Sequence, residues 1–149
     1  MQSKERVVVD AYIIKGALGV EYHRYDEVFL TMQKRNHILI INSKLVEKYS
    51  KAIRCNDYAP RGAMPKLIEL CSSDKVASVD EGIEKMEESN IKIKIEDEDD
   101  IPFVKAAIAA RAKYFITEDG KHLLPKKEEF KREYQIEVLT PEEYIKEQT

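Results

Sequence analysis

Glycine and proline are scarce in this sequence: its 149 residues contain five of each, and no Ser-rich or low-complexity tract divides the chain. No segment therefore has the composition of a flexible linker. The length suits one domain with a sizeable hydrophobic core. We expect residues 1–149 to form a single domain.

Cysteines and long apolar runs are also rare. The two cysteines, Cys55 and Cys71, are too far apart in sequence for a zinc or redox motif, so we expect reduced thiols rather than a disulfide. No run approaches the ~18 apolar residues that span a membrane, and no signal-peptide core opens the chain. The sequence predicts a soluble, cytoplasmic protein with no membrane contact.

Several common catalytic motifs are absent as well. The chain has no G-x-x-x-x-G-K-[ST], G-x-G-x-x-G, G-x-S-x-G or H-E-x-x-H. These absences exclude P-loop nucleotide hydrolysis and serine hydrolase chemistry. The 25 Lys and Arg against 28 Asp and Glu give a net charge of -3. Overall charge therefore does not favour nucleic-acid binding, although a local basic surface can still do so.

The sequence does contain a regular succession of strand and helix patterns. Strands are predicted at residues 6–9, 37–41 and 114–117, because positions 7–9, 38–41 and 114–116 are continuously apolar, which is typical of parallel strands covered on both faces. A further strand is predicted at 135–139, and residues 91–95 alternate isoleucine with lysine as an edge strand does. We expect an α/β fold with a mostly parallel central sheet of about five strands.

The segments between these strands predict helices. Helical spacing covers residues 25–35, 45–53 with Asn42 or Ser43 as its cap, 102–110, 128–134, and a last helix that starts at Thr140-Pro141. We expect Gly16 and Gly19 to interrupt the apolar segment 11–18. Residues 56–90 are the least regular part, and we expect an all-helical insertion there.

An acidic run opens the helix at 102–110. Residues 96–100 are five consecutive carboxylates, and Asp99 or Asp100 can cap that helix. For residues 96–99 we expect mainly a solvated, capping turn. Pro102 is tolerated in a first helical turn because the N–H that it lacks has no partner there.

Three aspartates are predicted to meet at one edge of the sheet. Asp10 follows the first strand, Asp119 follows the strand at 114–117, and Asp100 opens the helix between them. The carboxyl ends of parallel strands and the starts of the following helices share one edge, where sites form in open α/β sheets. Clustered carboxylates repel one another unless a cation is present, and their hard oxygens suit Mg²⁺ or Mn²⁺. Such an ion can orient a water and stabilise charge on a phosphate, which points to phosphodiester hydrolysis.

Three stretches of the chain resemble the PIN-domain family, which includes the VapC-type toxins. They are V-V-V-D at 7–10, D-x-x-D-I-P-F-V-x-A-A at 97–107 and A-K-Y-F-I-T-E-D-x-x-x-L-L at 112–124. The resemblance implies a three-layer α/β/α fold and a metal-dependent ribonuclease. It also implies that Asp10, Asp100 and Asp119 are catalytic, metal-binding carboxylates and that Thr117 supports the site.

The chain departs from the family at two places. The family follows its first Asp with Thr-Asn, whereas this chain has Ala11-Tyr12. The family also has a Glu in the helix after the second strand. Here the only acid of that helix is Glu47, but alignment by the apolar positions places the family's Glu on Lys48. Glu47 can therefore be a catalytic residue or an exposed partner of Lys51, and Lys48 can supply a positive charge to a phosphate but cannot bind metal.

Basic residues of the same helix form a stripe by their spacing. Its members are Lys44, Lys48, Lys51 and Arg54. The stripe can contact an RNA phosphate backbone, with Lys48 and Lys51 as substrate-binding candidates, or it can be a solvated helix face. His23, His37 and His122 lack metal-ligand spacing.

These observations favour a metal-dependent endoribonuclease acting on single-stranded or structured RNA. The resemblance also leaves room for an antitoxin-like protein partner and for a homodimer. The alternative is a catalytically degenerate PIN-like module that binds RNA or protein, for which the departures at Tyr12 and Lys48 argue. A receiver-type phosphoacceptor domain shares the topology, but it needs a lysine where Thr140-Pro141 stands.

Overall fold

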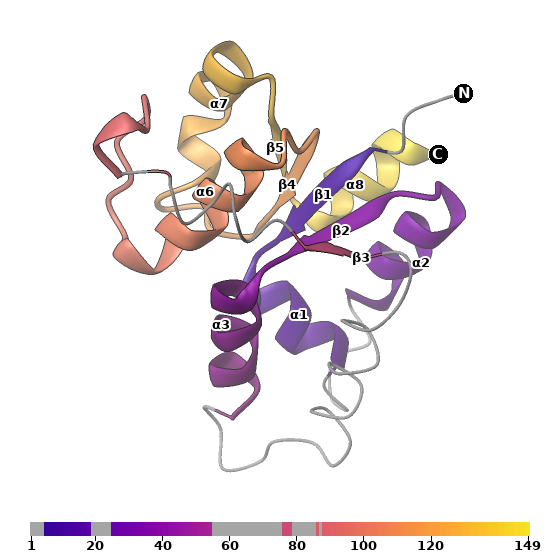
Figure 1. The fold of residues 1–149 in the computed structure, drawn as a ribbon. Helices are drawn as coiled ribbons and strands as arrows, with labels where there is room; N and C mark the ends of the chain where they lie inside the picture. The colour runs from indigo at the N-terminus through magenta and orange to yellow at the C-terminus, as the bar shows by residue number, and fades with distance from the viewer. Residues whose placement is uncertain (1–4, 19–24, 55–75, 79–85, 87) are drawn as a thin grey trace.

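The computed structural model describes residues 5–18, 25–54, 76–78, 86 and 88–149, and these form a parallel sheet flanked by helices (Figure 1). The sheet has the order β3-β2-β1-β4-β5, and every pair of neighbours is parallel. The strands are β1 (Arg6–Val9), β2 (Ile38–Ile41), β3 (Val76–Ser78), β4 (Tyr114–Ile116) and β5 (Glu137–Leu139).

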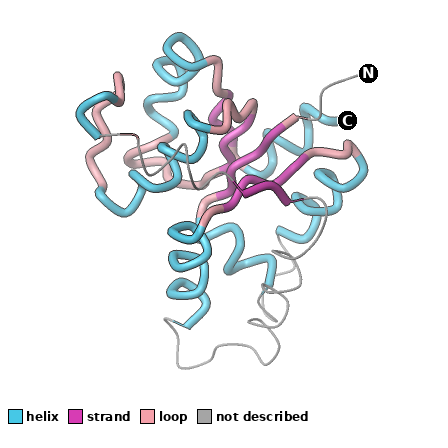
Figure 2. Tube along the Cα trace, viewed as in Figure 1, coloured by secondary structure: helices cyan, strands magenta, loops and turns pink. Residues whose placement is uncertain are grey.

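Helices cover both faces of this sheet. They are α1 (Ala11–Leu18), α2 (Asp26–Lys34), α3 (Ser43–Arg54), α6 (Ile101–Ala109), α7 (Lys127–Tyr134) and α8 (Pro141–Gln148), with short 3-10 turns η2 (Glu88–Asn90), η3 (Glu98–Asp100) and η4 (Leu124–Lys126). Figure 1 shows α6 and α7 on one side of the sheet and α1, α2 and α8 on the other, and Figure 2 shows the strands as the middle layer. The predicted three-layer α/β/α fold is confirmed.

The centre of the sheet supplies most of the hydrophobic core. Val7, Val8 and Val9 of β1 are fully buried, as is Phe115 of the adjacent β4. Strands covered on both faces need apolar side chains at every position, which is why β1 and β4 read as continuous apolar runs. Helix α3 is fixed beside β1, because the buried Tyr49 hydroxyl donates to the Val9 carbonyl at 2.7 Å.

Two predicted helix starts are confirmed by their caps. The Asn42 Oδ1 accepts from the Leu45 N–H at 2.8 Å, so Asn42 rather than Ser43 caps α3. At α8 the Thr140 hydroxyl accepts from the Glu143 N–H, and the Glu143 side chain accepts from the Thr140 N–H. This reciprocal pair, with Pro141 in the first turn, satisfies N–H groups that the helix itself cannot.

Three local predictions are wrong. Residues 56–90 are not all-helical, because β3 pairs with β2 at the sheet edge. The alternating segment 91–95 is not a strand; Ile93 is buried in the core, and the Lys92 N–H bonds the Tyr134 hydroxyl at 2.8 Å instead of a neighbouring strand. Gly16 lies inside α1 and does not end it.

Other sequence-based predictions fall outside the described residues. These are the break at Gly19, both cysteines, and the part of the predicted insertion between residues 56 and 75. Among the helices that the structure does describe, none has the length and apolarity to cross a membrane.

Candidate functional site

The predicted site lies where the order of the strands reverses. The chain passes from β1 to β2 on one side, whereas β4 pairs with β1 on the other, so the carboxyl ends of β1 and β4 border a switch point. Ligands of open α/β sheets bind at such points because the crossover helices diverge there. Asp10 follows β1, and its N–H donates to the carbonyl of Ile116, the last residue of β4, at 3.0 Å.

Thr117 joins the first aspartate to the third. Its fully buried hydroxyl donates to Asp10 Oδ2 at 2.8 Å and accepts from the Asp119 N–H at 3.0 Å. Because one hydroxyl makes both bonds, the position of the Asp10 carboxylate and the backbone of Asp119 are coupled. The structure thus brings the predicted supporting residue into contact with both aspartates.

The turn after β4 holds the Asp119 side chain in place. Its Oδ1 accepts from the N–H groups of Lys121 at 3.1 Å and His122 at 2.9 Å. An aspartate that bonds the backbone two and three residues further on is typical of a tight turn. The second oxygen of Asp119 is not used by these two bonds.

Asp100 reaches the site because another residue caps its turn. The Asp97 side chain accepts from the Asp99 N–H at 2.9 Å, while Asp100 occupies the N-cap position of α6 without any side-chain capping bond. The prediction of Asp99 or Asp100 as the cap is thus confirmed for the position of Asp100, although its side chain makes no capping bond. Asp100 is 8% exposed, and its Oδ2 has no hydrogen-bond partner among the described residues.

The pKa of Asp100 reflects its burial and the charges of the other two aspartates. Burial raises the pKa of Asp100 most, and the negative charge of Asp10 and a hydrogen bond with Asp119 raise it further, to about 8. Each effect disfavours the ionised carboxylate. Without a bound cation, the negative charges of the three aspartates are therefore not balanced by a positive charge.

The pKa of Asp10 is raised by the same two effects, burial and neighbouring negative charge. Burial raises the pKa of Asp10 above its ordinary value, and the charge of Asp119 adds to this effect. Hydrogen bonds from the Thr117 hydroxyl and from the N–H groups of Tyr12 and Ala11 lower the pKa again but do not cancel the rise.

The donor chemistry of these residues fits a divalent cation. Asp10 and Asp119 both raise the pKa of Asp100, and one buried oxygen of Asp100 lacks a hydrogen-bond partner among the described residues. Carboxylate oxygens are the ligands that Mg²⁺ and Mn²⁺ prefer, and the ion's charge would relieve the repulsion. Across the described part of the chain, however, no three His, Cys, Asp or Glu side chains already stand in a geometry that holds an ion. Ion binding would therefore require side-chain adjustment.

The two candidates on α3 have different surroundings. Glu47 is half-exposed and pairs with Lys51 at 3.3 Å and Lys44 at 3.8 Å on its own helix. Lys48 instead reaches across to the acidic segment, where its Nζ lies 2.9 Å from Asp99 Oδ1. The structure thus directs Lys48 rather than Glu47 toward the segment that carries Asp100. The catalytic role of Glu47 and the substrate-binding roles of Lys48 and Lys51 stay predictions.

Two contacts beside the site could not be predicted from the sequence. The Tyr25 hydroxyl donates to Glu118 Oε2, which lies between Thr117 and Asp119 in sequence. On the other flank, Glu96 pairs with His122 at 3.4 Å, so part of the acidic run is engaged with the turn after β4. Both contacts join residues far apart in the chain, and no local pattern reveals such pairs.

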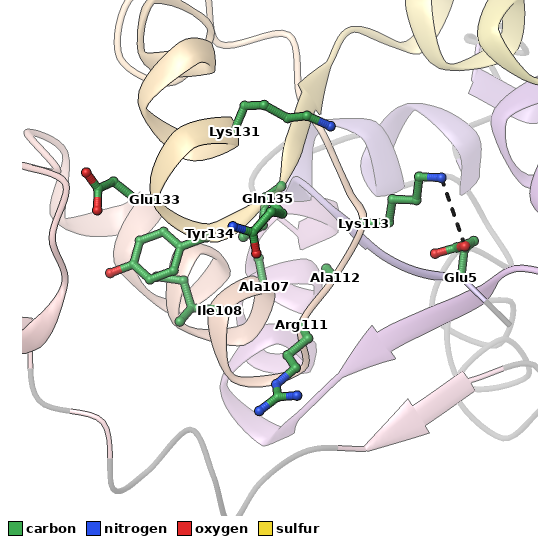
Figure 3. A pocket seen from close by; sticks show the side chains of 11 residues that line it. Glu5, Ala107, Ile108, Arg111, Ala112, Lys113, Lys131, Glu133, Tyr134 and Gln135 are labelled. Carbon is green, nitrogen blue, oxygen red and sulfur yellow. Dashed lines mark ion pairs between the residues drawn. The ribbon is translucent and has the colours of Figure 1, made fainter. Parts of the chain in front are cut away.

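A pocket of about 570 Å³ lies elsewhere (Figure 3). Its lining includes Glu5, Lys113 and Gln135, which precede β1, β4 and β5, so it opens at the amino ends of the strands. The Lys113–Glu5 ion pair at 4.0 Å lies in this lining. The aspartates follow the carboxyl ends, and none of the predicted site residues lines this pocket.

Replacing Thr117 with Val tests how the aspartates are positioned. Valine keeps the shape but removes the hydroxyl, and a residue that orients a metal ligand typically affects metal affinity by about 10–100-fold. We expect Mn²⁺ affinity measured by calorimetry to fall by about that factor and the free energy of unfolding to fall by about 1–3 kcal/mol. Thr117→Ser, which keeps the hydroxyl, should retain most of the Mn²⁺ affinity and most of the free energy of unfolding. Equal Mn²⁺ affinity in Thr117→Val and wild type would contradict this positioning role.

The fold and this site together define a parallel α/β/α domain with an acidic centre at the switch point of its sheet. The family model of the PIN domain matches residues 6–121, and the chain belongs to this family.

A solved structure supports the same fold. The chain resembles one in the crystal structure of VapBC2 from Rickettsia felis bound to a DNA fragment from their promoter, with a TM-score of 0.54 and 15% sequence identity. The similarity covers 91% of this chain and 98% of that one. No curated protein matches the chain significantly.

Proposed function

We propose that this protein is a metal-dependent endoribonuclease in which Asp10, Asp100 and Asp119 hold Mg²⁺ or Mn²⁺. A bound ion of this kind supplies an activated water and stabilises charge on a phosphodiester. The observation that supports the proposal most is the convergence of the three aspartates, with the buried Asp100 Oδ2 lacking a partner among the described residues.

The surrounding residues would prepare these carboxylates for the ion. The Thr117 hydroxyl orients Asp10, and the N–H groups of Lys121 and His122 orient Asp119. Asp100, with its pKa near 8 in the metal-free protein, must release its proton before it can act as a ligand. Ion binding near neutral pH would therefore release a proton.

Lys48 would contact the RNA backbone. It is held beside Asp99 and remains 21% exposed, so it can reach a phosphate that approaches the aspartates. Lys51, one turn further along α3, is 70% exposed and would extend the same basic edge. Neutralising phosphates with lysines supplies affinity without sequence preference.

The proposal includes a protein partner, a cellular location and an oligomeric state. The similar chain comes from VapBC2, which supports an antitoxin-like protein partner for this chain. We further propose that residues 1–149 act as one domain in the cytoplasm, where homodimers can form.

The direct test is cleavage of single-stranded RNA by the purified 149-residue chain. We expect internal cleavage with Mn²⁺ or Mg²⁺ and none with excess EDTA, and activity should return when the ion is added back. RNA that is bound but not cut under any of these conditions would contradict the proposal and favour the alternative, a degenerate binding module. That alternative has a specific basis, since Lys48 stands where alignment expects a Glu and Ala11-Tyr12 where the family has Thr-Asn.

Replacing Lys48 with Met separates the two interpretations of the lysine stripe. If Lys48 binds a phosphate, KM for RNA should rise by about 5–20-fold with a smaller change in kcat, because one charge-assisted contact contributes about 1–2 kcal/mol. Its exposed ion pair with Asp99 contributes little to stability, so Tm should hardly change. Lys131→Met, at the opposite edge of the sheet, is the matched control for lost charge. Equal KM values for the two variants would show that the stripe is only a solvated face.

A further inference from the structure

An exposed aromatic side chain stands directly beside the aspartates. Tyr12 lies in the first turn of α1 and is 60% exposed, one of two large hydrophobic residues in the described chain with this degree of exposure. Its backbone N–H donates to the Asp10 carboxylate. The ring therefore begins only two residues from a predicted metal ligand, and its main chain is fixed by that ligand.

A second tyrosine supports the first. The rings of Tyr12 and Tyr25 meet edge-to-face, with centroids 6.2 Å apart and an interplanar angle of 70°. Tyr25 is buried, and its hydroxyl donates to Glu118, the residue immediately before Asp119. The aromatic pair is thus attached at one end to Asp10 and at the other to the neighbour of Asp119.

This arrangement suits a stacking surface rather than a core contact. An edge-to-face contact leaves most of the outer ring open, as the exposure of Tyr12 shows. A ring that is already held in place loses little conformational freedom when a flat ligand stacks on it. Tyr12 contacts the Asp10 carboxylate through its backbone N–H, which leaves the aromatic face of its side chain for a ligand.

From this geometry we propose that Tyr12, supported by Tyr25, is a stacking platform for an unpaired nucleobase next to the phosphate that is cleaved. The inference rests on the proposed function, because it places the base of an RNA substrate beside the same aspartates. Aromatic side chains stack well on bases that are splayed out of a helix, whereas bases in a duplex already stack on their neighbours. The platform therefore selects single-stranded RNA over duplex RNA.

The test uses short single-stranded RNA carrying 2-aminopurine, whose fluorescence falls when it stacks. Binding is measured with Mg²⁺ in an Asp119→Asn background, so that turnover does not consume the RNA. We expect quenching on binding, and we expect Tyr12→Ala in that background to lose it and to bind about 10–100-fold more weakly. Tyr12→Phe should keep the quenching and the binding affinity, because it keeps the aromatic ring. Duplex RNA should compete poorly.

Leu30→Ala is the matched control, because Leu30 is the other exposed large hydrophobic residue, at 53%. Its binding and quenching should equal those of the background protein. If Tyr12→Ala binds and quenches as the background does, the platform is overturned and the exposed ring is left as a contact for a protein partner. If the unaltered chain fails to cleave RNA yet Tyr12 governs quenching, the stacking platform stands and the proposed cleavage fails.

Discussion

Replacing Asp119 with Asn should lower RNA cleavage by about 10³-fold, and Asp10→Asn should do the same. Each change keeps the side-chain shape but removes a charge that holds the ion, and loss of ~4 kcal/mol of transition-state stabilisation corresponds to that factor. Single-turnover cleavage of labelled RNA at saturating Mn²⁺ measures the effect. Because the aspartates act as one unit, the double variant should be little worse than either single one.

The matched control for this result is Glu98→Gln. Glu98 belongs to the same acidic run and is exposed, so its loss alters local charge without removing a predicted ligand. Its rate should stay within about twofold of wild type. An Asp119→Asn rate that matches the Glu98→Gln rate would contradict the assignment of Asp119 as a ligand.

The second large effect concerns stability in the absence of metal. The pKa of Asp100 in the folded protein is about 8, above its ordinary value of 3.8. A raised carboxyl pKa means that folding favours the protonated form, so this stabilisation is complete below pH 3.8 and is lost as the pH rises through about 8. At about pH 8, Asp100→Asn should therefore raise the free energy of unfolding by on the order of 2 kcal/mol, or Tm by about 4–8 °C.

Thermal unfolding in EDTA at about pH 5 and about pH 8 measures this prediction. The advantage of Asp100→Asn over wild type should grow from the lower to the higher pH. Added Mn²⁺ should then stabilise wild type more than the variant, because only wild type keeps the ligand. If the difference in Tm between the two proteins does not change with pH, Asp100 does not titrate in this range. Burial and the neighbouring aspartates then do not raise its pKa.

The central strands and the helix caps could be predicted because local physics determines them. Residues 7–9 and 114–116 are apolar and buried at every position, as strands covered on both faces must be. The start of α8 was evident because Thr140, Pro141 and Glu143 form a local capping pattern.

The edge strand and the segment at 91–95 show where local patterns fail. Strand β3 has three residues, Val-Ala-Ser, which is too short to show a period, and only pairing with β2 makes it a strand. The alternation at 91–95 has the period of a strand, but it arises from Ile93 entering the core beside Ile91 and Ile95. Tertiary packing overrides the pattern in both cases.

The positions of the site aspartates could be predicted from topology, whereas the residue of α3 that faces them could not. Asp10 and Asp119 follow parallel neighbours, so their approach follows from the strand order. On a helix, adjacent residues point about 100° apart, so a register uncertain by one residue leaves Glu47 and Lys48 undecided. Only the contact of Lys48 with Asp99 shows which of them faces the acidic segment.

The most direct measurement of the central claim is Mn²⁺ titration by isothermal calorimetry of wild type, Asp10→Asn, Asp100→Asn and Asp119→Asn. If the three aspartates share one ion, wild type should bind it at a specific site near neutral pH, and each substitution should weaken that same site by at least about tenfold. Wild-type affinity in any one of the three variants would contradict a shared ion.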